Sequence, residues 1–317
     1  MPLRVFRTLA DVPADFGPSA LTIGNFDGVH AGHRALLRRV AELGKAHAWK
    51  PSVLTFDPHP TKLVAPARAP RLLTSIDHRL ELMGEAGIEQ VLVLPFTMDV
   101  AKLTPEEFVS QILVHALKVR VVVVGDNFRF GSRQAGDMTK LRALGDVHGF
   151  TVEGAGEVSR RARIVSSTEV RKLLGAGNIT MANRLLEKPF ALEGGVVTGH
   201  GIGRSKTVPT LNLATIAEVL PAVGVYVTRT QNLDSGARLW ESITNIGYRP
   251  TFQGSELTIE TFLLSPFEGE DPKRIRVEFL LRVREERKFD SPEDLKSQIM
   301  RDIGVAQKYF RRTRTIY

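Results

Sequence analysis

Four runs of apolar residues in the first half of the chain constrain the fold most strongly. They are ALTIG (20–24), SVLTF (52–56), VLVLPF (91–96) and VRVVVVG (119–125). Continuous runs rich in Val and Leu are typical of strands covered on both faces, as in a parallel sheet. Helix-like segments separate the runs, and this alternation predicts a doubly wound α/β domain. In such a domain, ligands bind beyond the carboxyl ends of the strands.

Two of the intervening segments, 34–47 and 105–117, carry the apolar period of a helix. In the first of them, one face collects Leu36, Leu37, Val40 and Leu43. A third helix is expected after Ser166, because Glu169 stands three residues further on and the pair forms a capping box.

The pattern of apolar and polar residues changes near Ala191. Short mixed or alternating segments follow, separated by Gly, Pro and Asn-Asp turns, which is typical of an antiparallel barrel or sandwich. One long helix closes the chain, with a start signal at Ser291-Pro292. We therefore predict two domains, residues 1–186 and 187–317, and the length of 317 residues agrees with that number.

The stretch GNFDGVHAGH (24–33) follows the first apolar run directly and is the strongest candidate for a site. Gly24 and Gly28 allow a tight turn and close approach of a phosphate, and the N–H groups of the next helix would point at it. His30 and His33 are three residues apart, so both lie on one face of the first helical turn. Imidazoles placed there can donate hydrogen bonds to phosphate oxygens. Taken alone, the pair could also be metal ligands or ordinary polar residues at a helix start.

Composition narrows the class of protein. The chain has no Cys, which excludes disulfides, thiolate metal sites and cysteine nucleophiles, and suits a reducing cytoplasm. No apolar run is long enough to cross a membrane, and the first residues lack the features of a secretory signal. The net charge of +8 favours anionic partners such as nucleotides. No zinc-finger or RNA-binding pattern accompanies that charge, so we expect no nucleic-acid partner.

The stretch GNFDGVHAGH resembles the HxGH signature of the nucleotidyltransferase superfamily, which is related to class I aminoacyl-tRNA synthetases. The motifs TFDPHP (55–60), RLLTS (71–75), GDNFRFG (125–131) and VSSTEVR (165–171) follow in the order found in the bacterial bifunctional riboflavin kinase/FAD synthetase family. The resemblance implies a Rossmann-like FMN adenylyltransferase domain in the first half.

By that resemblance, His30, His33 and Arg171 act on the phosphates of ATP during adenylyl transfer. The nucleotide contacts it implies are Gly24, Phe26, Asp27 and Gly28, together with Ser166, Ser167 and Thr168 as a second phosphate clamp. The flavin contacts it implies are Asp57, His59, Asn127 and Phe128. Of Phe128 and Phe130, at least one is expected to fill the core instead.

The second half resembles the riboflavin kinase module, an antiparallel β-barrel with a terminal helix. The motifs are GVVTGHGIGRSKTVPTLNLA (195–214), NIGYRPTF (245–252) and IETFLL (259–264). The resemblance implies that Thr210 and Asn212 hold Mg²⁺, that Glu260 is the general base, and that Gly203 and Arg204 contact ATP. Without the flanking motifs, Glu260 would read as a surface residue on a strand.

The second half also departs from the family pattern. Thr207 stands where Gly is usual, and the Leu-Tyr-Gly that normally follows the IETFLL strand is missing. The expected function is synthesis of FMN from riboflavin and of FAD from FMN, with ATP and Mg²⁺. The alternative is a single-activity HxGH nucleotidyltransferase with a degenerate kinase barrel. We expect a cytoplasmic monomer or weak homo-oligomer whose partners are riboflavin, FMN and ATP.

Overall fold

The computed structural model describes residues 2–197, 210–214, 218–234, 239–251, 254–265 and 271–314. The chain folds into two compact units, Met1–Ser167 and Thr168–Tyr317. The predicted domain boundary after residue 186 stays a prediction. Two helices just before it, α7 (Ser167–Gly175) and α8 (Ile179–Leu186), fall almost wholly in the second unit. Asn183 on α8 explains part of this, because its side chain donates to the Phe279 carbonyl and accepts from the Phe190 amide of the barrel.

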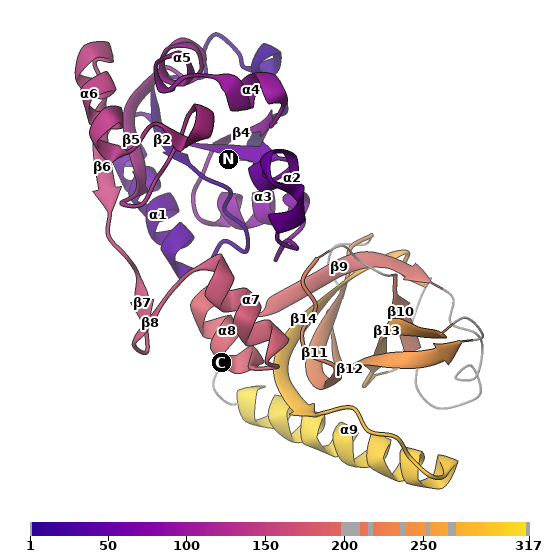
Figure 1. Ribbon diagram of the computed structural model, residues 1–317. Helices are drawn as coiled ribbons and strands as arrows, with labels where there is room; N and C mark the ends of the chain where they lie inside the picture. Colours follow the sequence, from indigo (N-terminus) through magenta and orange to yellow (C-terminus); the bar gives the residue numbers. More distant parts are fainter. Residues whose placement is uncertain are drawn as a thin grey trace. The chain divides into compact units, whose positions relative to one another are not determined.

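The first unit is built on a six-stranded parallel sheet with the order β1-β4-β3-β2-β5-β6 (Figure 1). Its strands are β1 (Arg4–Phe6), β2 (Ser19–Ile23), β3 (Lys50–Asp57), β4 (Gln90–Pro95), β5 (Val119–Gly125) and β6 (Thr151–Ala155). The four central strands coincide with the four apolar runs, because side chains on both of their faces are buried. The predicted doubly wound α/β architecture is confirmed. The edge strands β1 and β6 were not predicted.

Helices cover both faces of this sheet. They are α1 (Ala31–His47), α2 (Pro60–Val64), α3 (Ile76–Glu85), α4 (Met98–Lys102), α5 (Pro105–Glu107) and α6 (Met138–His148), and α5 continues as a π-helical stretch over Phe108–Ala116. One apolar cluster joins α1 and α3 to one face, and a second joins the π-helical stretch and α6 to the other. A short exposed hairpin, β7 (Ser159–Arg160) and β8 (Arg163–Ile164), precedes α7.

The second unit holds a closed antiparallel barrel with the order β10-β13-β12-β11-β14-β9 (Figure 1). Its strands are β9 (Phe190–Val197), β10 (Thr210–Leu213), β11 (Gly224–Asn232), β12 (Leu239–Thr251), β13 (Gly254–Leu263) and β14 (Arg274–Arg284). The choice between barrel and sandwich that the strand pattern left open is thereby settled. Inside the barrel, a chain of buried hydroxyls joins Thr228, Ser242, Thr244 and Thr261 at 2.8–2.9 Å.

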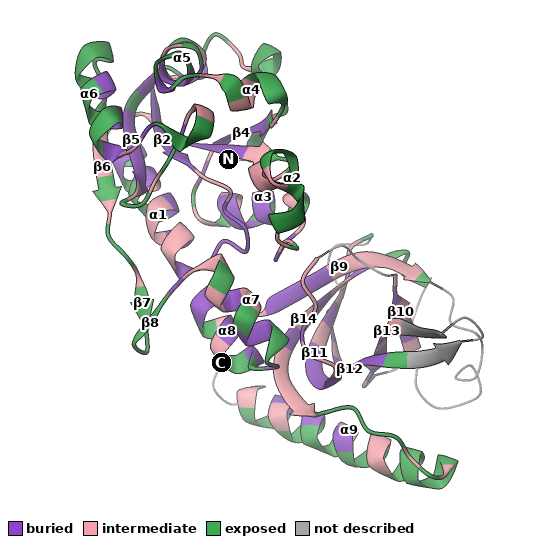
Figure 2. Cartoon of the chain, viewed as in Figure 1, coloured by how far each residue is buried: buried purple, intermediate pink, exposed green. Residues whose placement is uncertain are grey.

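The terminal helix α9 (Pro292–Arg314) packs its apolar face on the outside of the barrel, where Ala306 and Phe310 meet Val225, Val227 and Ile243. Its predicted start is confirmed, because the Ser291 hydroxyl accepts from the Asp294 amide at 3.1 Å. Figure 2 shows buried and exposed residues alternating along this helix. In the described part of the chain, no helix is both long and apolar enough to span a membrane.

Candidate functional sites

The residues of the first candidate site gather at one edge of the parallel sheet. Gly24 follows β2, Asp57 ends β3, and Asn127 lies two residues after β5. Because β2 pairs with β3 on one side and β5 on the other, these three carboxyl ends are neighbours. The chain reverses its direction of winding between β2 and β5, and such a switch point is where open α/β sheets bind ligands.

The loop between β2 and α1 has an unusual backbone. Phe26, Gly28 and Val29 all have positive φ, at 48°, 81° and 39°. This left-handed conformation costs little for Gly28, but for Phe26 and Val29 it requires support from the surrounding structure. Part of that support is packing, since the Phe26 side chain is completely buried and its ring lies 5.1 Å from that of His33.

Asp27 fastens the same loop to the segment that holds the RLLTS motif. Its Oδ1 accepts hydrogen bonds from the amides of Leu73 (2.8 Å) and Thr74 (3.3 Å), and the side chain is only 3% exposed. The Gly28 amide in turn donates to the Thr74 hydroxyl at 3.1 Å. The side chains of Phe26 and Asp27 thus face inward, so any contact that these residues make with a nucleotide would come from their backbone.

The two histidines lie at the mouth of α1, as the motif predicts. His30 is the N-cap, and its Nδ1 accepts from the His33 amide at 3.3 Å. The two rings are stacked with centroids 3.6 Å apart and planes 13° from parallel. Burial, helped by the charges of His30 and Arg79, holds the pKa of His33 well below its usual value of 6.5. His33 is therefore a neutral hydrogen-bonding group at physiological pH.

A second candidate site lies on the outer face of the barrel. On β10, the side chains of Leu211 and Leu213 are buried inward, so Thr210 and Asn212 face outward and are half-buried. Asn212 stands directly opposite Glu260 of β13. Directly opposite residues in antiparallel strands have Cβ atoms about 5 Å apart, so the amide and the carboxylate are neighbours.

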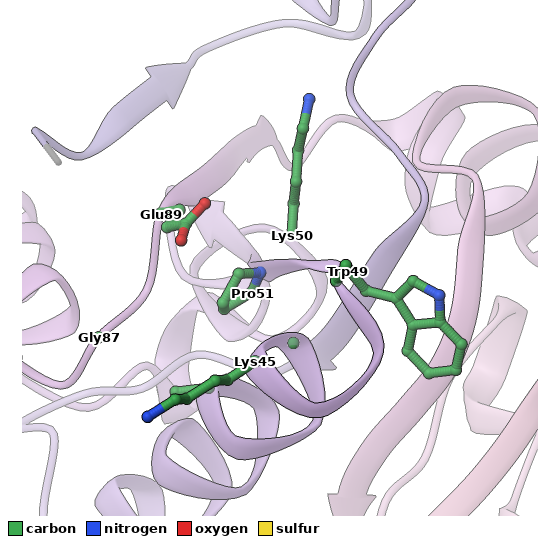
Figure 3. Close-up of a pocket in the computed structure, with 9 residues that line it drawn as sticks. Lys45, Trp49, Lys50, Pro51, Gly87 and Glu89 are labelled. Carbon is green, nitrogen blue, oxygen red and sulfur yellow. The ribbon is translucent and has the colours of Figure 1, made fainter.

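A hollow of about 430 Å³ lies far from both histidines. It is lined by Lys45 at the end of α1, by Trp49 and Lys50 near the start of β3, and by Glu89 just before β4. It therefore opens at the amino ends of the strands, about 25 Å along α1 from His30. Figure 3 shows Lys45 and Lys50 pointing in different directions, so the two ammonium groups do not converge on one ligand.

Comparison with known proteins identifies the family. Residues 12–169 match the FAD synthetase family model, and residues 186–310 match the riboflavin kinase model. The bifunctional riboflavin kinase/FMN adenylyltransferase of Escherichia coli (strain K12) is 36% identical over 308 residues, which are 97% of each chain. The chain belongs to this bifunctional family. The Pseudomonas fluorescens member is also 36% identical, over 96% of this chain and 97% of its own.

A solved structure has the same fold over the whole chain. It is a crystal structure described as a macrolide-efflux protein from Streptococcus pneumoniae, with a TM-score of 0.84, 26% identity, and coverage of 97% of this chain and 99% of that one. Its description names a different activity from those of the two bifunctional relatives. The match in fold supports the two-part architecture that the riboflavin kinase/FMN adenylyltransferase family shares.

The predicted flavin contacts of this family member lie around the switch point. Asp57 and Asn127 are exposed, and His59 caps α2 by accepting from the Thr61 amide at 3.2 Å. Phe128 is half-buried and stacks on Phe130 with centroids 5.6 Å apart. Phe130 is buried in the core, which confirms the expectation that at least one of the two rings serves packing.

The predicted second phosphate clamp is divided between the compact units. Ser166 and Ser167 belong to the first unit, where the Ser167 hydroxyl donates to the Asp27 carbonyl at 2.9 Å. Thr168 and Arg171 belong to the second, so their roles stay predictions. Gly203, Arg204 and Thr207 lie outside the described residues.

Sequence reasoning missed two features of these sites. Arg79 on α3 is 2% exposed and donates to the carbonyl of Asn25, in the loop between β2 and α1, at 2.9 Å. In the barrel, Asn245 of β12 faces Glu260 from the side opposite Asn212. The NIG motif contains Asn245 and could have signalled it, whereas Arg79 in DHRLEL has the local pattern of a surface charge.

Proposed function

We propose that this chain makes FAD from riboflavin in two ATP-dependent steps, one in each unit. The barrel phosphorylates riboflavin to FMN, and the parallel-sheet unit transfers AMP from ATP to FMN with release of pyrophosphate. The observation that supports this proposal is that one chain holds two candidate sites, one within the residues matched by each family model. Relatives named for both activities match the chain over nearly its whole length.

In the adenylyl transfer, a phosphate oxygen of FMN attacks the α-phosphorus of ATP and the bond to the β-phosphate oxygen breaks. The attacking phosphate is already ionised, so the site needs no general base, and catalysis rests on positioning and stabilisation of charge. Gly24 and Gly28 leave room for the triphosphate at the start of α1. His30 and His33 donate to phosphate oxygens, and the family motif supports a further phosphate contact from Ser166 and Ser167 of the same unit, with Thr168 and Arg171 following in the motif.

The flavin of FMN would occupy the same edge of the sheet. Asn127 and Asp57 supply exposed polar atoms at the ends of β5 and β3, the two strands that flank β2, and Phe128 offers an aromatic face that is only partly covered. A flat, mostly apolar ring with polar edges requires a pocket of this composition.

In the kinase reaction, Glu260 accepts the proton of the ribityl 5′-hydroxyl while that oxygen attacks the γ-phosphorus of ATP and ADP leaves. The hydroxyl of Thr210 and the amide oxygen of Asn212 are hard donors beside this carboxylate, and such donors fit Mg²⁺. When bound, Mg²⁺ neutralises phosphate charge. Gly203 and Arg204 would contact the nucleotide.

The test is one incubation of the protein with riboflavin, ATP and Mg²⁺, with riboflavin, FMN and FAD separated over time. We expect FMN to appear first and FAD after it. His33→Ala should abolish FAD formation and leave FMN formation nearly intact, whereas Glu260→Gln should block FMN formation yet still convert added FMN to FAD. If added FMN becomes FAD but riboflavin is never phosphorylated, the kinase half of the proposal is wrong. Equal loss of both activities in a folded variant would contradict separate sites.

The expectations of a cytoplasmic location, of a monomeric or weakly associating chain and of no nucleic-acid partner stay predictions. Sedimentation of the protein with and without ATP and FMN checks the second of these directly.

A further inference from the structure

A buried arginine lies beneath the loop between β2 and α1, where the proposed function places the phosphates of ATP. Arg79 is 2% exposed, and one of its terminal nitrogens donates to the Asn25 carbonyl at 2.9 Å. The Thr55 hydroxyl approaches the same carbonyl at 3.5 Å. A charged side chain is rarely buried to this extent without a specific partner, because leaving water is costly for the charge. Arg79 is thus tied to the loop that begins at the end of β2.

Three buried polar atoms near this loop have no hydrogen-bond partner among the residues that the structure describes. They are Thr22 Oγ1, His33 Nδ1 and Arg79 Nε. Thr22 lies two residues after Ala20 on β2, so it points to the sheet face that α1 and α3 cover, and these helices carry His33 and Arg79 (Figure 1). All three atoms therefore belong to one side of the sheet, at the same strand end.

The chemistry of these three atoms is complementary. An arginine N–H can only donate, a threonine hydroxyl can donate or accept, and a neutral imidazole has one donor and one acceptor nitrogen. If Nδ1 of His33 accepts a hydrogen bond from the Thr22 hydroxyl or from Arg79 Nε–H, directly or through one buried water, these unpaired atoms become satisfied. The proton of the neutral ring must then reside on Nε2.

The charges around Arg79 support its place here. Asp27 and Asp57 act against the lowering of its pKa by burial, so the guanidinium remains protonated. Burial chiefly, then His30 and this positive charge, keep the pKa of His33 low. The titratable groups that act on Arg79 and His33 are thus His30 at the N-cap of α1, Asp27 from the loop before it and Asp57 from the end of β3.

We propose that Arg79 is a positioning residue for adenylyl transfer, which fixes the Asn25 carbonyl and orients His33 so that Nδ1 accepts a hydrogen bond and Nε2–H faces the nucleotide. The proposal rests on the adenylyl transfer proposed above. A ring held in this tautomer presents the same donor to phosphate throughout the physiological pH range, with no proton to gain or lose between turnovers. Arg79 itself need not touch the substrate.

The first readout is spectroscopic and needs no substrate. Full-length protein carrying ¹⁵N-labelled histidine is studied by NMR between pH 5 and 8. We expect His33 to be the neutral Nε2–H tautomer at pH 7. Arg79→Met, which keeps the volume and removes the charge and the donors, should raise the pKa of His33 and admit the Nδ1–H tautomer. Arg79→Lys keeps the charge and should leave the pKa closer to that of the wild type.

The second readout is kinetic. Arg79→Met should lower kcat for FAD formation from FMN and ATP about 10- to 100-fold, the size of effect found when the partner that orients a metal-bound histidine is removed, with a smaller change in KM for ATP. FMN formation by the barrel of the same molecule is the matched control and should be unchanged. Thr22→Val, which removes only the hydroxyl, provides a second test should Arg79→Met not fold.

Two results would overturn the proposal: a wild-type His33 that carries its proton on Nδ1, or an Arg79→Met protein with unaltered His33 resonances and an unaltered rate of FAD formation. A failure of the proposed adenylyl transfer can be distinguished from a failure of the Arg79 proposal. If the wild-type protein makes no FAD from FMN, the adenylyl transfer is wrong, while the NMR spectra still report whether Arg79 sets the state of His33.

Discussion

The hydrogen bonds of Asp27 allow a direct test of how the loop between β2 and α1 is held in place. Asp27→Ala removes the acceptor of two buried amides, those of Leu73 and Thr74. A hydrogen bond to a charged group contributes about 1.5–3 kcal/mol, and the longer of the two bonds contributes least. We therefore expect a loss of about 3–4 kcal/mol in the free energy of opening this segment. Both bonds end on Oδ1, so Asp27→Asn can keep both acceptor contacts and should lose only about 1–2 kcal/mol.

Hydrogen–deuterium exchange of the full-length protein measures this difference. A peptide covering residues 71–78 should exchange about 10²- to 10³-fold faster in Asp27→Ala than in the wild type, and about 10-fold faster in Asp27→Asn. Peptides from the barrel are the control and should be unaffected. The rate of FAD formation from FMN should fall more in Asp27→Ala than in Asp27→Asn. If the Ala and Asn variants exchange alike, the carbonyl-type acceptor is not what holds the loop, and the reasoning fails.

Three further predictions concern stability. The pKa of His33 is held below 6.5 in the folded protein, so its contribution to the stability of the first unit is complete above pH 6.5 and is lost as the pH falls toward the folded pKa. His33→Gln should therefore flatten the dependence of the thermal-unfolding temperature on pH below 6.5. Asp302→Ala removes a carboxylate that is 5% exposed and forms a 2.9 Å ion pair with Arg284. The free energy of unfolding of the barrel should fall by about 2–4 kcal/mol, and α9 should become sensitive to limited proteolysis. Thr244→Val deprives the buried hydroxyls of Thr228 and Thr261 of a hydrogen-bond partner, so the free energy of unfolding measured with denaturant should fall by about 1–3 kcal/mol. Thr180→Val, on the surface, should leave it almost unchanged.

The central strands could be predicted because burial on both faces leaves a continuous apolar run in the sequence. The edge strands could not, for the opposite reason. Strand β6 contains Glu153 and Gly154, and its residues are exposed or half-buried, so no apolar run marks it. Strand β1 has only three residues, and its pairing with β4 comes from a distant segment.

The positions of the candidate site residues on their helix and strand could be predicted because each motif is continuous in sequence, while their contacts with ligand stay predictions. His30 and His33 share one helical turn, and Thr210 and Asn212 share one face of a strand, so local periodicity places each pair. Glu260 could be placed beside Asn212 only by resemblance, since no local pattern fixes which residues of two strands stand opposite each other.

Residues that support the candidate ligand-facing groups come from distant parts of the chain, where the local sequence gives no sign of this role. Arg79 lies 54 positions from the carbonyl it binds, and in its own helix it resembles a solvated charge. Glu286 follows β14 yet lies against Gly247 of β12, where an added Cβ would collide with its carboxylate and stand 3.1 Å from the amide of Asn245. That carboxylate is the end of a flexible, exposed side chain and can move aside, so it does not by itself fix the residue at position 247. Because Arg79 lies in the first unit and Asn245, directly opposite Glu260, lies in the second, disturbing Arg79 should impair FAD formation alone, and disturbing Asn245 should impair FMN formation alone.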